Sequence, residues 1–287
     1  MAAVLVRLLT YRAASGLRTG ELLPGDRVRD LAAGPLEEHL ARGYEFDGPS
    51  VESVVGEAGT LALDEIELLA PVRPGKILCV GYNYRGHVPD GATTADPDPE
   101  FPDVFVKTPN VLVGPRDAVP LPAVDADVDY EGEIAVVIGR TAKNVPLERA
   151  AEHVAGYTVF NDVSARDWQR RTSQWALGKN FDGFGPLGPV LVTPDEIADP
   201  GDLLVEVVRD RVVTVSQSTS TCIFSMPFLV HYLSTVMTLE PGDIISTGTP
   251  QKLPEAQERH RPLADGDAVT VRVAGVGELT TTFRESA

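Results

Sequence analysis

The stretch DYEGEIAVVI, residues 129–138, places three carboxylates directly before an unbroken apolar run. The run is largely β-branched, which is typical of a buried strand, and it predicts a strand over 128–138. Side chains two residues apart point to the same face of a strand, so Glu131 and Glu133 are predicted to project together, with Asp129 on that face. Carboxylates grouped beside an apolar strand are costly unless a positive group compensates them, and a hard divalent cation is one candidate. A solvated polar face of an edge strand is the alternative.

Short apolar runs of the same kind recur along the chain. They lie at residues 76–80, 104–107, 157–162, 190–192, 203–215, 243–247 and 268–273. Glycine and proline signals separate them, which predicts a mainly β fold of the α+β class, with antiparallel or mixed sheets and few helices. Helices are expected at 165–171, with Ser164 as N-cap, and at 224–237. The proline-rich, acidic stretch 88–103 is predicted to be a loop.

The first seventy residues are interpreted as a separate unit. A strand is expected at 4–11 and helices at 35–42 and 51–57. Pro71 and Pro74 mark a junction, because neither residue donates a hydrogen bond to a strand ladder. We therefore predict a small N-terminal α/β domain over residues 1–70 and a larger domain over 71–287.

A further carboxylate, Asp162, ends the predicted strand 157–162 just before the expected helix start at Ser164. It is either a third oxygen ligand or part of the helix cap. Ligation by oxygen alone selects Mg²⁺, Mn²⁺ or Ca²⁺ over zinc, which prefers the clusters of His and Cys that this sequence lacks.

Cationic and polar side chains follow in the same region. Arg166 and Gln169 are three residues apart, hence on one helical face, and Lys179 comes soon after them. Cations near an acidic metal site suit a substrate carboxylate, and salt bridges at the surface are the alternative. His87 stands in a polar turn after the strand 76–80, where functional side chains are often displayed.

The composition argues against several classes of function. Lys plus Arg number 25 against 42 Asp plus Glu, and the resulting net charge of −17 would repel nucleic acid over most of the surface. Apolar windows fall short of the roughly 20 residues that a bilayer span needs. No glycine-rich nucleotide motif or nucleophile elbow occurs. Cys79 and Cys222 are predicted to be buried thiols, which suits a reducing cytoplasm.

Six separated segments together resemble the fumarylacetoacetate hydrolase family. In chain order they are VGYNY (80–84) with His87, VFVK (104–107), DYEGE (129–133), NDVSARDWQ (161–169), GKNFD (178–182), and PGD (241–243) leading to TGTP (247–250). They cover about residues 74–285. The resemblance implies a mixed β-sandwich roll, assembled as a homodimer, with Mg²⁺ or Mn²⁺ held by Glu131, Glu133 and Asp162.

The resemblance also implies roles for other residues. His87 would activate water with the help of an acid three positions later, which is Asp90 here, and Glu100 is the alternative acid. The positions that match substrate contacts in the family are Arg166, Gln169, Lys179 and Thr249, and Lys179 is also taken as catalytic. After Pro250 relatives continue with a glycine-containing turn, whereas this chain has a polar insert over 251–261, a departure that bears on substrate preference.

The prediction is a metal-dependent hydrolase that cleaves a C–C bond in a 2,4-diketo acid, of the acylpyruvate or fumarylpyruvate type. The same enolate chemistry supports oxaloacetate decarboxylation, keto–enol tautomerisation, and hydration or isomerisation of dienoates. A non-catalytic metal-binding relative with the same fold is a further alternative. We expect a small keto acid as ligand, a cytoplasmic, catabolic role, and neither nucleic acid nor a membrane as partner.

Overall fold

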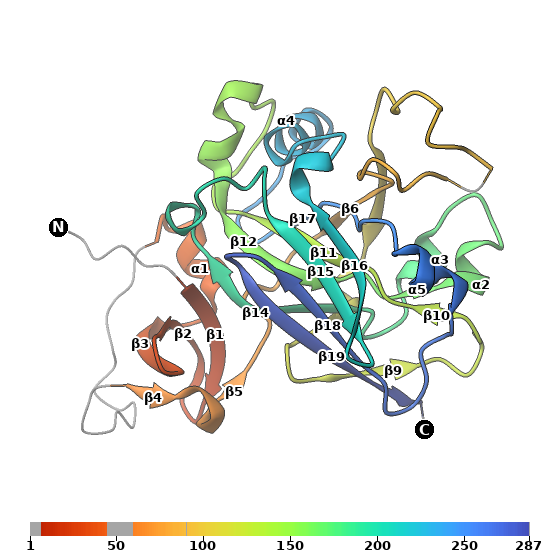
Figure 1. Ribbon diagram of the computed structural model, residues 1–287. Coiled ribbons are helices and arrows are strands. Elements are labelled where there is room, and N and C mark those ends of the chain that lie inside the picture. Colours follow the sequence, from red (N-terminus) through yellow and green to blue (C-terminus); the bar gives the residue numbers. More distant parts are fainter. Residues whose placement is uncertain (1–6, 45–59, 90, 287) are drawn as a thin grey trace.

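A large mixed β-sheet forms the centre of the computed structural model, which describes residues 7–44, 60–89 and 91–286 (Figure 1). Its strands lie in the order β4-β3-β2-β1-β14-β12-β11-β17-β6-β7, with β5 on β1 and β8 on β14. Their bounds are β1 Arg7–Ala13, β2 Gly16–Leu23, β3 Arg27–Ala33, β4 Leu61–Ala62, β5 Glu67–Leu68, β6 Ile77–Gly81, β7 Asp103–Lys107, β8 Leu112–Val113, β11 Gly132–Ile138, β12 Val154–Asn161, β14 Gly185–Val192 and β17 Ile244–Ser246. The buried, β-branched β11 and β12 are central in it, as a two-faced core strand requires.

A second sheet of five strands packs on the first (Figure 1). Its order is β16-β15-β18-β19-β9, with bounds β9 Ala118–Leu121, β15 Leu204–Arg209, β16 Val212–Ser218, β18 Ala268–Val273 and β19 Gly277–Glu285. The two sheets lie close together at Gly132, where a Cβ would lie 2.4 Å from a methyl of Val207 and 2.9 Å from one of Val271. Only glycine fits at this crossing, and the core lies between the sheets on either side of it.

Short elements complete the fold. The two-stranded pair is β10 Val128–Asp129 with β13 Ser164–Ala165, and the α-helices are α1 Leu36–Ala41, α2 Arg166–Gln169, α3 Ala176–Lys179, α4 Met226–Val236 and α5 Pro254–Glu258. The 3₁₀ turns are η1 Leu63–Glu65, η2 Pro109–Val111, η3 Leu147–His153, η4 Pro194–Glu196 and η5 Thr219–Thr221. Helix α4 begins at Ser225, whose hydroxyl accepts from the Phe228 N–H, and it packs on η3.

The mainly β, α+β class predicted from the sequence is confirmed, but two predicted elements are wrong in detail. The strand expected over 128–138 is interrupted at residues 130–131, because β10 pairs with β13 while β11 pairs with β12. The helix expected over 165–171 is only the four residues of α2. Ser164 lies in β13 and its hydroxyl donates to the Asp162 carbonyl at 3.0 Å, so it does not cap the helix.

The N-terminal strands extend the large sheet, since β1 pairs with β14. A separate domain over residues 1–70 stays a prediction, and the expected helix at 51–57 lies outside the described residues, as do residues 4–6 of the first expected strand. The described part of the predicted loop 88–103 holds no helix, and Asp103, where β7 begins, is its one described strand residue. No helix among the described residues has both the length and the apolar character of a membrane span.

Candidate active site

Three carboxylates meet where β11 begins and β12 ends. These strands are antiparallel, with Gly132 opposite Asn161, so Glu131 and Glu133 at the start of one lie beside Asp162 at the end of the other. The Asp162 N–H donates to the Glu131 carbonyl at 2.8 Å and fixes the junction. One oxygen from each carboxylate lies within 4.8 Å of the others. The strand pairing therefore assembles the cluster from two segments about thirty residues apart.

Three cations compensate this cluster. Lys179 Nζ lies 2.6 Å from Glu131 Oε2 and 2.7 Å from Asp162 Oδ2. Lys107 Nζ lies 2.5 Å from Asp162 Oδ1, and Arg166 Nη1 lies 2.6 Å from Glu131 Oε1. Both lysines are almost completely buried. Buried ions need such partners, because transfer of an unpaired charge from water into the protein costs several kcal/mol.

The two glutamates differ in their protonation. Burial alone would raise the pKa of Glu131, but the charges of Lys179 and Arg166 outweigh it and hold that pKa well below its usual range. Burial, together with the charges of Asp162 and Glu131, raises the pKa of Glu133 to about 8. Glu133 Oε2 accepts from the Ser246 hydroxyl and, at 3.0 Å, from the Gly248 N–H. Of the two glutamates, Glu133 is therefore the one on which burial and the neighbouring carboxylates disfavour the negative charge.

This donor set suits a hard divalent cation. All three side chains offer carboxylate oxygens, which Mg²⁺, Mn²⁺ and Ca²⁺ prefer, and no imidazole or thiolate belongs to the cluster. Burial and repulsion from Asp162 and Glu131 raise the Glu133 pKa, and a bound cation would offset both effects. Glu131, Glu133 and Asp162 are accordingly the residues that could hold a metal.

His87 stands opposite the carboxylates on the loop that follows β6. Its Nδ1 lies 2.8 Å from the Thr249 carbonyl oxygen, so in the neutral ring Nδ1 carries the hydrogen and donates it. Burial lowers the pKa of His87, which favours that neutral form at pH 7. The ring of Tyr82 contacts it edge-to-face at 5.4 Å between centroids. The Thr249 hydroxyl in turn donates to the Gly132 carbonyl at 3.0 Å, which ties the histidine to the start of β11.

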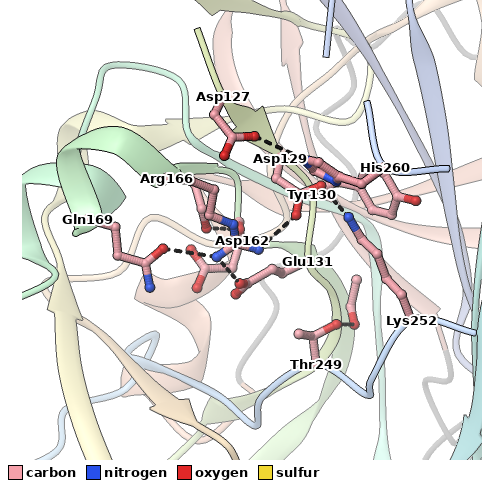
Figure 2. A network of polar contacts seen from close by, with 12 residues as sticks. Asp127, Asp129, Tyr130, Glu131, Asp162, Arg166, Gln169, Thr249, Lys252 and His260 are labelled. Carbon is pink, nitrogen blue, oxygen red and sulfur yellow. Dashed lines mark hydrogen bonds and ion pairs between the residues drawn. The ribbon is translucent and has the colours of Figure 1, made fainter. Parts of the chain in front are cut away.

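A single cavity of about 420 Å³ joins these groups. Its lining includes His87, Glu131, Glu133, Arg166, Gln169, Lys179 and Thr249, with Tyr82, Phe105 and Trp175 as its aromatic wall. Figure 2 shows Arg166 and Gln169, from α2, turned toward Glu131 and Asp162. Asp162, with no exposed surface, lies behind the lining. The cavity is small, polar on one wall and aromatic on the other, as suits a small anionic ligand.

Most of the predicted site residues therefore line one cavity, and Asp162 lies behind its wall, but three others are not among these residues. Asp90, the predicted partner of His87, lies outside the described residues. Glu100 is exposed and does not line the cavity. Asp129, expected on the same strand face as the glutamates, is separated from them by the break at residues 130–131 and binds Arg166 and Lys252 instead.

Other site residues were not predicted. Lys107 sits at the end of an apolar strand, and a lysine there is a signal of a buried carboxylate partner. Ser246 and Trp175 carry no signal that sequence reasoning could use. Lys252 lies in the polar insert, where exposure is the ordinary expectation, yet its side chain is only 16 % exposed.

Comparison with known proteins agrees with this geometry. Residues 76–284 match the family model described as fumarylacetoacetate (FAA) hydrolase, C-terminal. The human mitochondrial oxaloacetate tautomerase FAHD2A is 41% identical over 289 residues, which cover 96% of this chain and 90% of that protein. The oxaloacetate tautomerase YisK of Bacillus subtilis is 42% identical over 263 residues, covering 91% and 87%.

Among solved structures, maleylpyruvate hydrolase from Sphingobium sp. SYK-6, in complex with manganese(II) and pyruvate, is similar throughout. The TM-score is 0.76 at 28% identity, and the match covers 98% of this chain and 100% of that one. The relatives thus include both tautomerases and a hydrolase. On the family model and on relatives of more than 40% identity, this chain belongs to the fumarylacetoacetate hydrolase family.

Proposed function

We propose that the protein is a metal-dependent keto–enol tautomerase that acts on oxaloacetate. The observation that carries the proposal is His87, whose Nδ1 is held by the Thr249 carbonyl in the same cavity as the acidic cluster. Among the described residues none bonds to its Nε2, so this nitrogen is available for proton transfer. The names of the human and Bacillus relatives support oxaloacetate as the substrate.

Each residue of the site has a distinct role in the proposed tautomerisation. The chemistry that a divalent ion held by Glu131, Glu133 and Asp162 would supply is Lewis-acid polarisation of a substrate oxygen. Arg166 and Gln169 bind and orient the substrate carboxylate, while Thr249, whose hydroxyl donates to the Gly132 carbonyl, lines the cavity beside them. Lys179 pairs with both Glu131 and Asp162 and so holds the two carboxylates in place. The aromatic wall excludes bulk water, which strengthens these interactions.

Proton transfer falls to His87. The neutral ring takes a proton from C3 of the keto form at Nε2 and returns it to the C2 oxygen. One C–H bond breaks and one O–H bond forms, and the imidazole ends in the state in which it began. The reverse sequence converts the enol to the ketone. The reaction consumes no water and needs no carboxylate partner for His87. It is therefore compatible with a histidine whose Nδ1 is hydrogen-bonded to a backbone carbonyl.

Hydrolysis of a 2,4-diketo acid is the second candidate. The manganese and pyruvate complex of maleylpyruvate hydrolase favours it, because a pyruvate unit is one product expected of such a cleavage. The same His87 would then take a proton from water. Tautomerisation is the first candidate because of the partner of His87 Nδ1. Among the described residues that partner is the Thr249 carbonyl and not a carboxylate that would assist His87 in activating water. Homodimer assembly and a cytoplasmic location stay predictions.

Two substrates separate the candidates. Wild-type protein with Mg²⁺ is mixed with freshly dissolved enol-oxaloacetate, followed by its ultraviolet absorbance, and separately with acetylpyruvate, followed by release of pyruvate. We expect faster ketonisation than in Mg²⁺ buffer alone, and a kcat/KM for acetylpyruvate lower by on the order of 10² or more. Glu131→Gln is the control that should be inactive on both. Rapid cleavage of acetylpyruvate without any ketonisation would put the hydrolase first.

A further inference from the structure

Lys252 links the polar insert to the catalytic cavity. The Leu253 N–H donates to the Thr214 carbonyl on β16 at 2.8 Å and anchors the insert beside Lys252. Lys252 Nζ lies 2.5 Å from Asp129 Oδ1 and 4.3 Å from the centre of the Tyr130 ring. It lines a second cavity, of about 510 Å³, whose wall shares Arg166 with the catalytic one. Lys252 is therefore joined to the site through one buried carboxylate.

Asp129 carries this connection to Arg166. Its side chain is 6 % exposed, and its second oxygen, Oδ2, lies 2.9 Å from Arg166 Nη2. Arg166 Nη1 donates to Gln169 Oε1 at 2.9 Å and pairs with Glu131 Oε1 at 2.6 Å. Figure 2 shows the row Lys252, Asp129, Arg166 and Glu131, in which positive and negative groups alternate. The guanidinium is thus held between two carboxylates, one on each side.

A second bridge runs parallel to the first. Asp127 Oδ1 lies 2.9 Å from His260 Nε2, and Asp127 Oδ2 lies 3.2 Å from Arg170 Nη1. Arg170 follows Arg166 by four residues, so both arginines of this turn are tied through an aspartate to a basic residue of the insert. The Asp127 bridge is more exposed to solvent than the Lys252 bridge, and exposed ion pairs contribute little to stability. The Lys252 bridge is the one that matters for Arg166.

We propose that Lys252 is a positioning residue, which shares the Asp129 carboxylate with Arg166 and so leaves the guanidinium oriented toward Glu131 and the substrate. If the Lys252 ammonium is removed, Arg166 is the one ionic partner that the described residues leave to the buried Asp129 carboxylate. The guanidinium then turns toward Asp129 and away from Gln169. The insert is in this way part of the substrate-binding apparatus. The inference rests on the proposed function for the identity of the ligand, a small dianion with a carboxylate at Arg166.

The test measures oxalate binding to the Mn²⁺-loaded protein by calorimetry, which needs no turnover. Lys252→Met keeps the aliphatic stem and removes the charge, and Arg261→Met is the matched control, because Arg261 lies in the same insert but pairs with Asp210 and Asp267. We expect the Kd for oxalate to rise about tenfold in Lys252→Met and less than about twofold in the control. Lys252→Arg should restore most of the affinity.

The double-mutant cycle with Arg166→Met shows whether Lys252 acts through the arginine. In that background, Lys252→Met should change the Kd less than about twofold. Equal weakening in both backgrounds, no weakening in either, or no oxalate binding by the wild type would overturn the proposal. If Lys252→Met does not fold in a thermal scan, Lys252→Gln takes its place in the same cycle. Coupled oxalate binding by a protein that does not ketonise oxaloacetate would overturn the proposed function alone.

Discussion

At the scale of single residues, His87 owes its chemical state to two neighbours. The Thr249 carbonyl selects the ring form with hydrogen on Nδ1, and burial disfavours the charged imidazolium. A histidine of this kind can accept a proton at neutral pH. It loses that capacity only when the solution is acidic enough to convert the ring to imidazolium. Its lowered pKa therefore makes a prediction about the pH dependence of the reaction.

We expect kcat/KM for oxaloacetate to stay constant as the pH falls from 8 to about 6.5, the ordinary pKa of histidine, and to decline only below it. The sign follows from the shift, because a lowered pKa moves protonation of His87 to more acidic solution. The measurement is a pH–rate profile with Mg²⁺ saturating at every point. His87→Gln should lack this acidic decline. An acidic limb centred above pH 6.5 in the wild type would be incompatible with the environment described for His87.

At the scale of elements, the site depends on the turn that follows β17. Gly248 has φ +95°, and its N–H donates to Glu133 Oε2 at 3.0 Å. A Cβ at this position would lie 2.8 Å from the Val80 carbonyl oxygen. Glycine is required here both for the left-handed backbone and for the close approach to β6.

Gly248→Ala should therefore reduce both stability and metal affinity. Gly266→Ala is the matched control, since Gly266 also has a left-handed φ, +79°, but nothing lies within 4 Å of its Cβ position. Left-handed alanine costs roughly 1–2 kcal/mol in either place. Denaturant unfolding should show a greater loss of unfolding free energy for Gly248→Ala, and calorimetry should show weaker Mn²⁺ binding in that variant alone. Equal losses of unfolding free energy and of Mn²⁺ affinity in the two variants would show that the turn at Gly248 has no special role in the site.

The strands that carry the carboxylates were only partly predictable from local sequence patterns. Periodicity found β11 and β12 and placed Glu131 and Glu133 on one face, because a strand's two-residue repeat is local. It left Asp162 as either a ligand or part of a helix cap, and only the family resemblance implied the set of three. Periodicity did not find the break at residues 130–131, since that break comes from the pairing of β10 with β13, a contact between distant segments. Lys252 was missed for the same reason, because its partner Asp129 lies 123 residues earlier in the chain.

At the scale of the whole molecule, charge is divided unevenly. The chain carries a net charge of −17, yet Lys107, Lys179 and Arg166 are concentrated around three carboxylates in its interior. These six groups are close to neutral together, so a bound divalent ion would leave the cavity positive within an acidic protein. A positive cavity complements a dianion such as oxaloacetate. The overall charge therefore does not oppose a small anionic substrate, although it does oppose nucleic acid.

The most direct test of the account is deuterium incorporation at C3 of oxaloacetate, followed by proton NMR in D₂O with Mg²⁺. Enolisation at C3 is the step assigned to His87 beside the acidic cluster, and it leaves this isotopic record whatever the later fate of the substrate. Wild-type protein should exceed the rate of Mg²⁺ buffer, a chelator or Glu131→Gln should abolish the excess, and His87→Gln should reduce it by on the order of 10². A wild-type rate equal to that of buffer, or an undiminished rate in His87→Gln, would contradict the account.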